Sequence, residues 1–408
     1  MPALKNISTL YTCRDEGGQA DVHPIKNAAI VWEGDIIQWV GKESDLPEEY
    51  STEIAFDAGK KMVIPGLVDC HTHLCFGGWR ADEFEMRIQG RSYLDIAKAG
   101  GGILSTVKAT RETSEDELYE KAAGLLEKIQ QQGVTSIECK SGYGLSLGAE
   151  LKQLRVYKRL AERSPVHITS TFLGAHTIPP EFKGNRHGYI DLIIGEMIPA
   201  VAEENLASFC DIFVEESAFS IDEARQIFEA GKKHGLQPKL HADQLSSGGG
   251  AELAAEVGAI SADHLEQISD TGIQKMAEAG VVGVTLPLAS LYTQQPYLDC
   301  RKLVEGGINV AVATDFNPGS APVYDLPLAM MLTCNHGRLT PAETLKGSTI
   351  YAAKAIGTDH RVGSLEPGKS ADFAVINSPD INFWMYHFRG TVTDQIFLKG
   401  KEGNELQE

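Results

Sequence analysis

The sequence predicts an α/β fold: a (β/α)8 TIM-like barrel over residues 63–362, with a small β-sandwich domain formed by both termini, residues 1–62 and 363–408. Two observations carry this prediction. Eight short apolar runs alternate with helix-like or irregular segments through the middle of the chain, as in a barrel of parallel strands. Segments of β character lie at both ends. For the alternating part, an open doubly wound sheet is the main alternative.

The two ends of the chain carry similar strand signals. Residues 28–41 are two apolar runs around Glu33, Gly34 and Asp35, which indicates a hairpin. Near the other end, β-branched and aromatic runs are interrupted by Gly, Pro and Asp. Because both ends differ from the middle in the same way, we expect them to form one domain.

The middle of the chain carries strong helix-start signals between its apolar runs. Ser114 with Glu117, and Ser220 with Glu223, have the spacing of capping boxes, and each precedes an apolar face with helical period. Further helical patterns occupy residues 147–160, 269–280 and 297–307. The eight predicted strands lie in residues 63–70, 134–140, 166–176, 209–217, 236–243, 258–264, 280–289 and 308–316.

Titratable or metal-binding residues recur just after these runs. In order along the chain they are His71, His73, Lys140, His176, His241, His264 and Asp315. In a barrel these positions all lie at the C-terminal mouth, where active sites of this fold are found. His71 and His73 project to the same side of a strand and can share one ion, and neutral imidazole suits zinc or iron. A lone histidine pair is a weak signal, but the whole set favours a metal site.

Composition excludes several classes of function. The net charge of −19 argues against a nucleic-acid partner and against binding to an anionic membrane surface. No apolar run approaches the roughly 20 residues that span a bilayer, and the N-terminus lacks the pattern of a secretory signal. The seven cysteines are scattered without a C-x-x-C pair, which is typical of reduced thiols. We therefore expect a soluble cytoplasmic protein.

Seven motifs resemble the imidazolonepropionase family of the amidohydrolase superfamily, over essentially the whole chain. They are VIPGLVDCHTHLCFGG, GGGILSTV, KSGYGL, FLGAHTIPPEF, LHADQLS, ADHLE and ATDFNPGS. The opening P-G-x-x-D-x-H-x-H pattern is superfamily-wide, whereas KSGYGL and FLGAHTIPPEF are specific to this family. The resemblance implies a metal-dependent barrel that hydrolyses the cyclic amide of 4-imidazolone-5-propanoate to N-formimidoyl-L-glutamate, in histidine degradation.

The resemblance also implies one metal ion, zinc or iron, held by His71, His73, His241 and Asp315. Dinuclear members of the superfamily bridge two metals with a carboxylated lysine at the end of strand four, and here that strand has no lysine. Lys140 follows strand two and is not assigned as a ligand; a partner for a nearby carboxylate is the simpler interpretation. The ligand set does not choose between zinc and iron.

Two residues are the catalytic candidates. Asp315, beside the metal, would take the proton of the attacking water and return it to the departing ring nitrogen. His264 would hydrogen-bond the nucleophile or the developing oxyanion. How the two residues share proton transfer stays open.

The substrate is a small anion, so the site needs local positive charge against an acidic background. Arg80 matches a family substrate-binding position and can grip a carboxylate in a bidentate fork. The remaining substrate-binding candidates by the same matching are Tyr143, His176, Gln244, Asn317, Gly319 and Ser320. Arg186 and His187 could also meet the substrate, but no motif says so.

Two alternatives stay open. One is another mononuclear amidohydrolase, a heterocycle deaminase or a different cyclic amidase. Gln244 weakens the deaminase hypothesis. Deaminases of this superfamily carry a glutamate at that position, and a glutamine amide has no proton to relay near pH 7. The other is a metal-free scaffold relative, although such relatives have usually lost ligands and here all are present. The expectation of a homodimer rests on the family resemblance alone.

Overall fold

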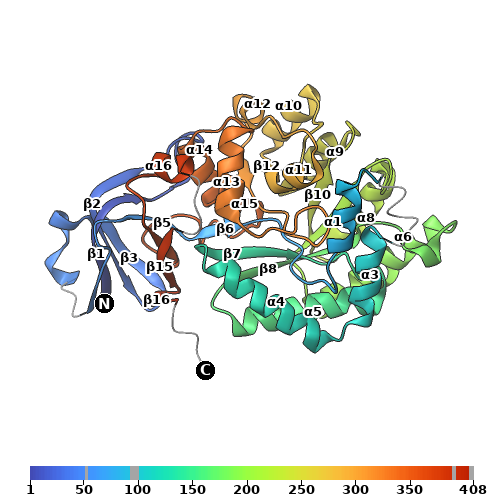
Figure 1. Ribbon diagram of the computed structural model, residues 1–408, viewed down its shortest axis with the longest axis horizontal. Coiled ribbons are helices and arrows are strands. Elements are labelled where there is room, and N and C mark those ends of the chain that lie inside the picture. Colours follow the sequence, from blue (N-terminus) through green and yellow to red (C-terminus); the bar gives the residue numbers. More distant parts are fainter. Residues whose placement is uncertain (51–53, 92–100, 388–391, 404–408) are drawn as a thin grey trace.

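The barrel is an eight-stranded parallel sheet at one end of the molecule (Figure 1). The computed structural model describes residues 1–50, 54–91, 101–387 and 392–403. Each barrel strand pairs with the next along the chain, in the order β6 to β13. The strands are β6 (Leu67–Asp69), β7 (Val134–Lys140), β8 (His167–Ala175), β9 (Phe209–Val214), β10 (Gln237–Ala242), β11 (Ser261–His264), β12 (Val282–Thr285) and β13 (Val310–Val312).

The sheet closes between its first and last strands, just beyond their carboxyl ends. Asp315 N donates to His71 O at 3.1 Å, and His73 N donates to Phe316 O at 2.8 Å. Thr72 forms a parallel bridge with Phe316. The barrel prediction is therefore confirmed over the open doubly wound sheet, and the seam of closure runs through the predicted metal ligands.

Helices cover the outside of the barrel (Figure 1). Both predicted capping boxes are present: Ser114 with Glu117 starts α4, and Ser220 with Glu223 starts α8. The described helices are α1 (Ala81–Ile88), α3 (Ile103–Glu112), α4 (Glu115–Gln130), α5 (Leu147–Arg163), α6 (Arg186–Leu192), α7 (Ile198–Glu203), α8 (Ile221–Lys233), α9 (Gly250–Val257), α10 (Asp270–Ala279), α11 (Pro287–Thr293), α12 (Cys300–Glu305), α13 (Leu326–Asn335), α14 (Pro341–Gly347), α15 (Ile350–Ala355) and α16 (Ile381–Tyr386).

The two ends of the chain come together in a separate sheet, as predicted. Its strands hydrogen-bond into one mixed sheet in the order β16-β15-β14-β5-β1-β2-β3, with β4 paired to β1. The Trp32 ring packs edge-on against Phe373 and Phe397, with ring centroids 5.4 and 5.6 Å away. The strands are β1 (Pro2–Tyr11), β2 (Pro24–Glu33), β3 (Ile36–Lys42), β4 (Ile54–Asp57), β5 (Met62–Pro65), β14 (Phe373–Ile376), β15 (Thr393–Leu398) and β16 (Lys401–Glu402).

One strand prediction is wrong in detail. The apolar run at residues 63–70 was expected to be a single barrel strand, but β5 pairs with β1 and β14 in the terminal sheet and only β6 belongs to the barrel. Gly66 lies between them, and a Cβ there would come 2.0 Å from Thr135 Oγ1, so the position requires glycine. The domain boundary at residue 63 stays a prediction, and the terminal sheet's pairing runs on to Pro65.

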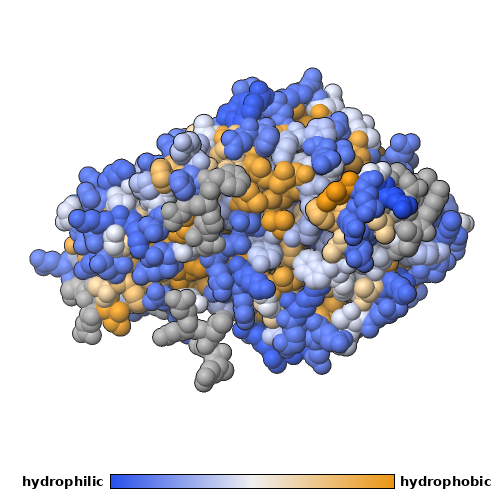
Figure 2. Space-filling view, in the orientation of Figure 1, coloured by the Kyte–Doolittle hydropathy of each residue, from blue (hydrophilic) through white to orange (hydrophobic). Residues whose placement is uncertain are grey.

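Of the helices that the structure describes, none has both the length and the apolar character needed to cross a membrane. Figure 2 shows mainly hydrophilic side chains over one face of the molecule, with an apolar area near the middle of the barrel.

Candidate metal centre and active site

The four predicted metal ligands meet at the carboxyl ends of β6, β10 and β13. Asp315 Oδ1 lies 3.5 Å from His71 Nε2 and 3.6 Å from His73 Nε2. The ring centroids of His71 and His241 are 4.6 Å apart, and all four side chains are buried. His71 is central: it groups with His73 and Asp315, and separately with His241 and His264, in sets whose ligand atoms lie within 4.8 Å of one another.

Buried carboxylates orient two of these histidines. His71 Nδ1 lies 2.6 Å from Asp263 Oδ2, and His241 Nδ1 lies 3.0 Å from Asp211 Oδ1. The Nε2 atom of each ring is buried and makes no hydrogen bond with any residue the structure describes. Burial holds the pKa of both imidazoles well below the usual value, which favours the neutral form that ligates metal. Unsatisfied buried nitrogens of this kind fit a metal ion.

Asp315 and His264 both have left-handed backbone conformations, with φ of 54° and 80°. Such conformations are uncommon outside glycine and cluster at functional sites. Burial raises the pKa of Asp315 to about 7. The His264 ring lies 5.4 Å from His241 and 5.8 Å from His71, centroid to centroid. The structure therefore brings both catalytic candidates to the predicted ligands.

Lys140 lies beneath this centre. Its Nζ donates to Asp211 Oδ2 at 2.7 Å and to Glu138 Oε1 at 2.9 Å, and lies 3.4 Å from Asp263 Oδ2. A second buried amine, Lys239, is 3.3 Å from Glu138. Lys140 is thus a partner of carboxylates, the simpler of the interpretations considered from sequence.

Sequence reasoning missed Asp211 and Asp263. Both lie inside barrel strands rather than after them, and both are completely buried. The available signal was a carboxylate within an apolar strand, in the segments FCDIFVEES and ADHLE. A lone charge in such a run needs a buried partner.

Arg80 and Gly319 lie against each other at the mouth. A Cβ built on Gly319 would fall 0.9 Å from Arg80 Nη2 and 2.0 Å from Cζ, so the guanidinium occupies the space that any other residue would need. The Arg80 side chain is 12% exposed, with Nε 3.8 Å from Glu83 Oε2. Arg80 Nε is buried without a hydrogen-bond partner among the described residues. Apart from the ion pair with Glu83, the described residues leave this buried donor able to bind an anionic ligand.

Tyr143 and His176 lie beside the metal-site candidates. The His176 ring stacks on His73 at 5.4 Å and 18°, and the Tyr143 ring is 5.4 Å from His176. His176 Nδ1 lies 3.0 Å from Gly142 O, a contact that turns the other ring nitrogen away from the backbone. Burial lowers the pKa of His176 to about 4 and raises that of Tyr143.

The Asn317 side chain hydrogen-bonds within its own loop. Its Nδ2 donates to Asp315 O at 2.7 Å and to Ser320 Oγ at 2.9 Å, and its Oδ1 accepts from Gly319 N and Ser320 N, both at 2.8 Å. The side chain therefore ties Asp315, Gly319 and Ser320 into one loop.

Gln244 is half-buried, and its side chain makes no hydrogen bond to the described part of the chain. The neighbouring Asp243 accepts from Gly248 N, Gly250 N and Ala251 N at 2.9–3.1 Å. Asp243 thus organises the start of α9.

Of the two residues that no motif supported, one forms an ion pair and the other is exposed to solvent. Arg186 forms an ion pair with Glu223 at the start of α8, and its guanidinium packs on Phe219 at 5.3 Å. His187 is exposed.

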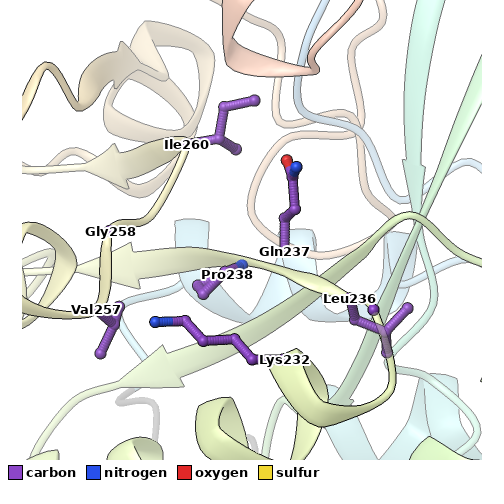
Figure 3. A pocket seen from close by; sticks show the side chains of 8 residues that line it. Lys232, Leu236, Gln237, Pro238, Val257, Gly258 and Ile260 are labelled. Atoms are coloured by element: carbon purple, nitrogen blue, oxygen red, sulfur yellow. The ribbon is translucent and has the colours of Figure 1, made fainter.

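A surface depression of about 440 Å3 lies at the opposite end of β10 from His241 (Figure 3). Figure 3 shows Lys232, Leu236 and Ile260 around it, where β10 and β11 begin. Its lining holds no histidine or carboxylate, so it is separate from the predicted centre.

Comparisons with known proteins agree with this geometry. Residues 195–403 match the model of the amidohydrolase family. The imidazolonepropionase of Geobacillus thermodenitrificans is 50% identical over 93% of this chain and 91% of its own length. That of Fusobacterium nucleatum is 45% identical over 98% and 97%. A zinc-containing structure of an atrazine chlorohydrolase variant from Arthrobacter aurescens covers 98% of this chain and 95% of its own, with a TM-score of 0.74 and 15% identity, which supports the fold alone.

Fold and site together define a hydrolase of the metal-dependent amidohydrolase family. Identity at this level over nearly the whole chain is more specific than fold. The chain belongs to the imidazolonepropionase family.

Proposed function

We propose that the chain hydrolyses the cyclic amide of 4-imidazolone-5-propanoate to N-formimidoyl-L-glutamate, a step of histidine degradation. The observation that carries the proposal is the 50% identity to an imidazolonepropionase over 93% of the chain. The cluster of buried imidazoles and one carboxylate at the barrel mouth supports it independently, because this donor set suits hydrolytic chemistry.

We infer a single zinc or iron ion held by His71, His73, His241 and Asp315. The Nε2 atoms of His71 and His241, which have no hydrogen-bond partner in the described part of the chain, support this set. When bound, the ion would supply Lewis-acid activation of water and of the amide carbonyl. Imidazole and carboxylate ligands accept either metal, and the zinc in the atrazine chlorohydrolase structure makes zinc the first to test.

The protein's own groups would move the protons. Asp315 would accept a proton from the attacking water, whose oxygen bonds to the carbonyl carbon. As the carbon–nitrogen bond breaks, Asp315 would return that proton to the ring nitrogen. His264 would donate a hydrogen bond to the developing oxyanion, a contribution of roughly 3 kcal/mol for a well-aimed donor.

Arg80 would bind the propanoate carboxylate. Its position over Gly319 supports this role, and so does Nε, which has no hydrogen-bond partner among the residues that the structure describes. Tyr143 and His176 would contact the imidazolone ring, with Gln244 and Ser320 as further polar contacts. Because the Asn317 amide is hydrogen-bonded within its loop, we propose that it acts by holding Gly319 and Ser320 in place.

The test is direct assay with freshly prepared 4-imidazolone-5-propanoate. Formimidoylglutamate, identified by mass spectrometry, should appear at the rate at which substrate absorbance is lost. Amino-heterocycles such as guanine should release no ammonia. Ammonia release without ring opening would instead support the deaminase alternative, and zero metal together with zero turnover in protein purified without chelators would support the scaffold alternative.

Location and assembly are also proposals. All seven cysteines are free thiols, which supports a reducing compartment such as the cytoplasm. The homodimer expected from family resemblance stays a prediction that light scattering would test.

A further inference from the structure

We propose that Lys140 is a positioning residue for the metal centre: its ammonium group holds the two carboxylates that orient His71 and His241. The proposal rests on the metal-dependent function proposed above. It concerns a residue that would touch neither metal nor substrate.

The contacts form one connected path. Lys140 Nζ is 2.7 Å from Asp211 Oδ2, and the other oxygen of that carboxylate is 3.0 Å from His241 Nδ1. On the other side, Nζ is 3.4 Å from Asp263 Oδ2, which is 2.6 Å from His71 Nδ1. One cation on β7 is therefore linked to a histidine that follows β6 and to another on β10.

The buried environment favours a cation beside these carboxylates. Lys140, Glu138, Asp211 and Asp263 are all completely buried, so none of their charges is stabilised by water. Three carboxylates in one buried cluster repel one another unless a cation lies among them. Without Lys140, Asp211 and Asp263 would rotate apart or lose charge, and either change weakens the bonds that fix the rings.

Those bonds determine which ring nitrogen faces the metal. When Nδ1–H donates to a carboxylate, the lone pair is on Nε2. In both rings this atom has no hydrogen-bond partner within the described ranges. Lys140 would therefore act on metal affinity through ring tautomer and orientation. Three carboxylates surround its three N–H donors, and an ammonium group has no lone pair, so Lys140 is not itself a metal ligand.

Lys239 supplies a matched control. It is also completely buried, and it lies on the barrel strand β10. Its Nζ is 3.3 Å from Glu138 and donates to Ala355 O at 2.9 Å. Among the described residues it forms no ion pair with Asp211 or Asp263 within 4.0 Å. Loss of this amine removes the same charge and burial without removing the contacts to the two orienting carboxylates.

The experiment compares Lys140→Met with Lys239→Met. Zn2+ affinity is measured by competition with a chromophoric chelator, and ligand geometry by the visible spectrum of the Co2+-loaded protein. Lys140→Met should weaken Zn2+ binding about 10- to 100-fold, the usual cost of losing an outer-shell partner, and change the Co2+ spectrum. Lys239→Met should leave the Zn2+ affinity within about threefold of the parent value, even if its Tm falls as much as that of Lys140→Met. At saturating Zn2+, Lys140→Met should lower kcat more than it raises KM.

Equal Zn2+ affinity in Lys140→Met and the parent protein, or equal weakening in both lysine variants, would overturn the proposal. If Lys140→Met does not fold, two milder variants test the same idea. Lys140→Gln keeps N–H donors without charge, and Ser261→Ala removes the hydroxyl that donates to Asp263 Oδ1 at 2.7 Å. Both should weaken Zn2+ binding by less than the methionine change, and unchanged affinity in both would also overturn it.

The parent protein separates this inference from the proposed function. If the parent neither binds Zn2+ nor opens the imidazolone ring, the proposed function fails. If it does both and the Lys140 variants bind Zn2+ equally well, only the positioning role fails.

Discussion

At the scale of single residues, Asp315 combines two proposed roles, ligand and base. Its Oδ1 lies within 3.6 Å of two imidazole nitrogens, and its backbone is held in a left-handed conformation. Asp315→Asn keeps the shape and removes the basic oxygen. We expect kcat to fall about 100- to 10,000-fold. Metal content, measured in parallel, separates the roles: substantial turnover with a full complement of metal would exclude Asp315 as the base.

Arg80 should act chiefly on substrate binding. Arg80→Ala removes a charge-assisted bond worth about 1.5–3 kcal/mol, so KM should rise roughly 10- to 100-fold with a smaller effect on kcat. Arg14, in the terminal domain with its side chain 42% exposed, gives a control in Arg14→Ala. An unchanged KM in the Arg80 variant would place the carboxylate contact elsewhere.

Sequence reasoning could predict that residues placed at strand ends come together. His71, His241 and Asp315 fall at the ends of the first, fifth and eighth strands, and the barrel brings such positions together. It missed Asp211 and Asp263, because their role depends on which histidine lies beside each strand. That pairing comes from contacts between strands far apart in sequence, which periodicity does not encode.

At the scale of elements, the loop after β13 determines where Arg80 can lie. Gly319→Ala would place a Cβ on the Arg80 guanidinium, so it should raise KM as Arg80→Ala does while leaving metal content intact. Gly148→Ala in α5 is the control, since a Cβ there meets nothing within 4 Å. A normal KM in Gly319→Ala would mean that Arg80 binds substrate from another position.

The capping box of α4 offers a prediction on stability alone. Ser114 Oγ accepts from Glu117 N at 3.3 Å, and Glu117 Oε2 accepts from Ser114 N at 3.0 Å. Ser114→Ala should lower the free energy of unfolding by about 1 kcal/mol, seen as a lower Tm with unchanged kcat, whereas Ser114→Thr should keep the cap. Equal Tm values for the alanine variant and the parent would show that packing, not the cap, determines where α4 begins.

Element boundaries were harder to predict than element types. The capping boxes located α4 and α8 because the signal is local and stereochemical. The run from Val63 to Asp69 gave no sign that it is shared between two sheets. The run divides at Gly66, where Thr135 of β7 leaves no room for a Cβ, and that tertiary contact is not visible in the sequence.

At the scale of the whole molecule, the proposed ligands come from β6, β10 and β13, the first, fifth and eighth strands of the barrel. They include the seam where Asp315 N donates to His71 O at 3.1 Å. A metal ion there would connect the strand that leaves the terminal domain with the strand that closes the barrel. Metal binding should therefore stabilise the closed barrel as a whole and not only the site.

Metal removal tests this expectation. Binding to the folded state alone adds about 4 kcal/mol when free metal is 1,000 times its Kd, so chelator treatment should lower Tm and added Zn2+ or Fe2+ should restore it. Mg2+ serves as the control and should restore little, because a site built from three imidazoles and one carboxylate suits zinc or iron better than a cation that prefers oxygen ligands. In Lys140→Met the same amount of Zn2+ should raise Tm by less than in Lys239→Met, since the weaker affinity reduces the stabilisation. A Tm that does not respond to Zn2+ or Fe2+ would mean that the cluster at the seam is not a metal site, because any ion held by the folded barrel alone must stabilise it.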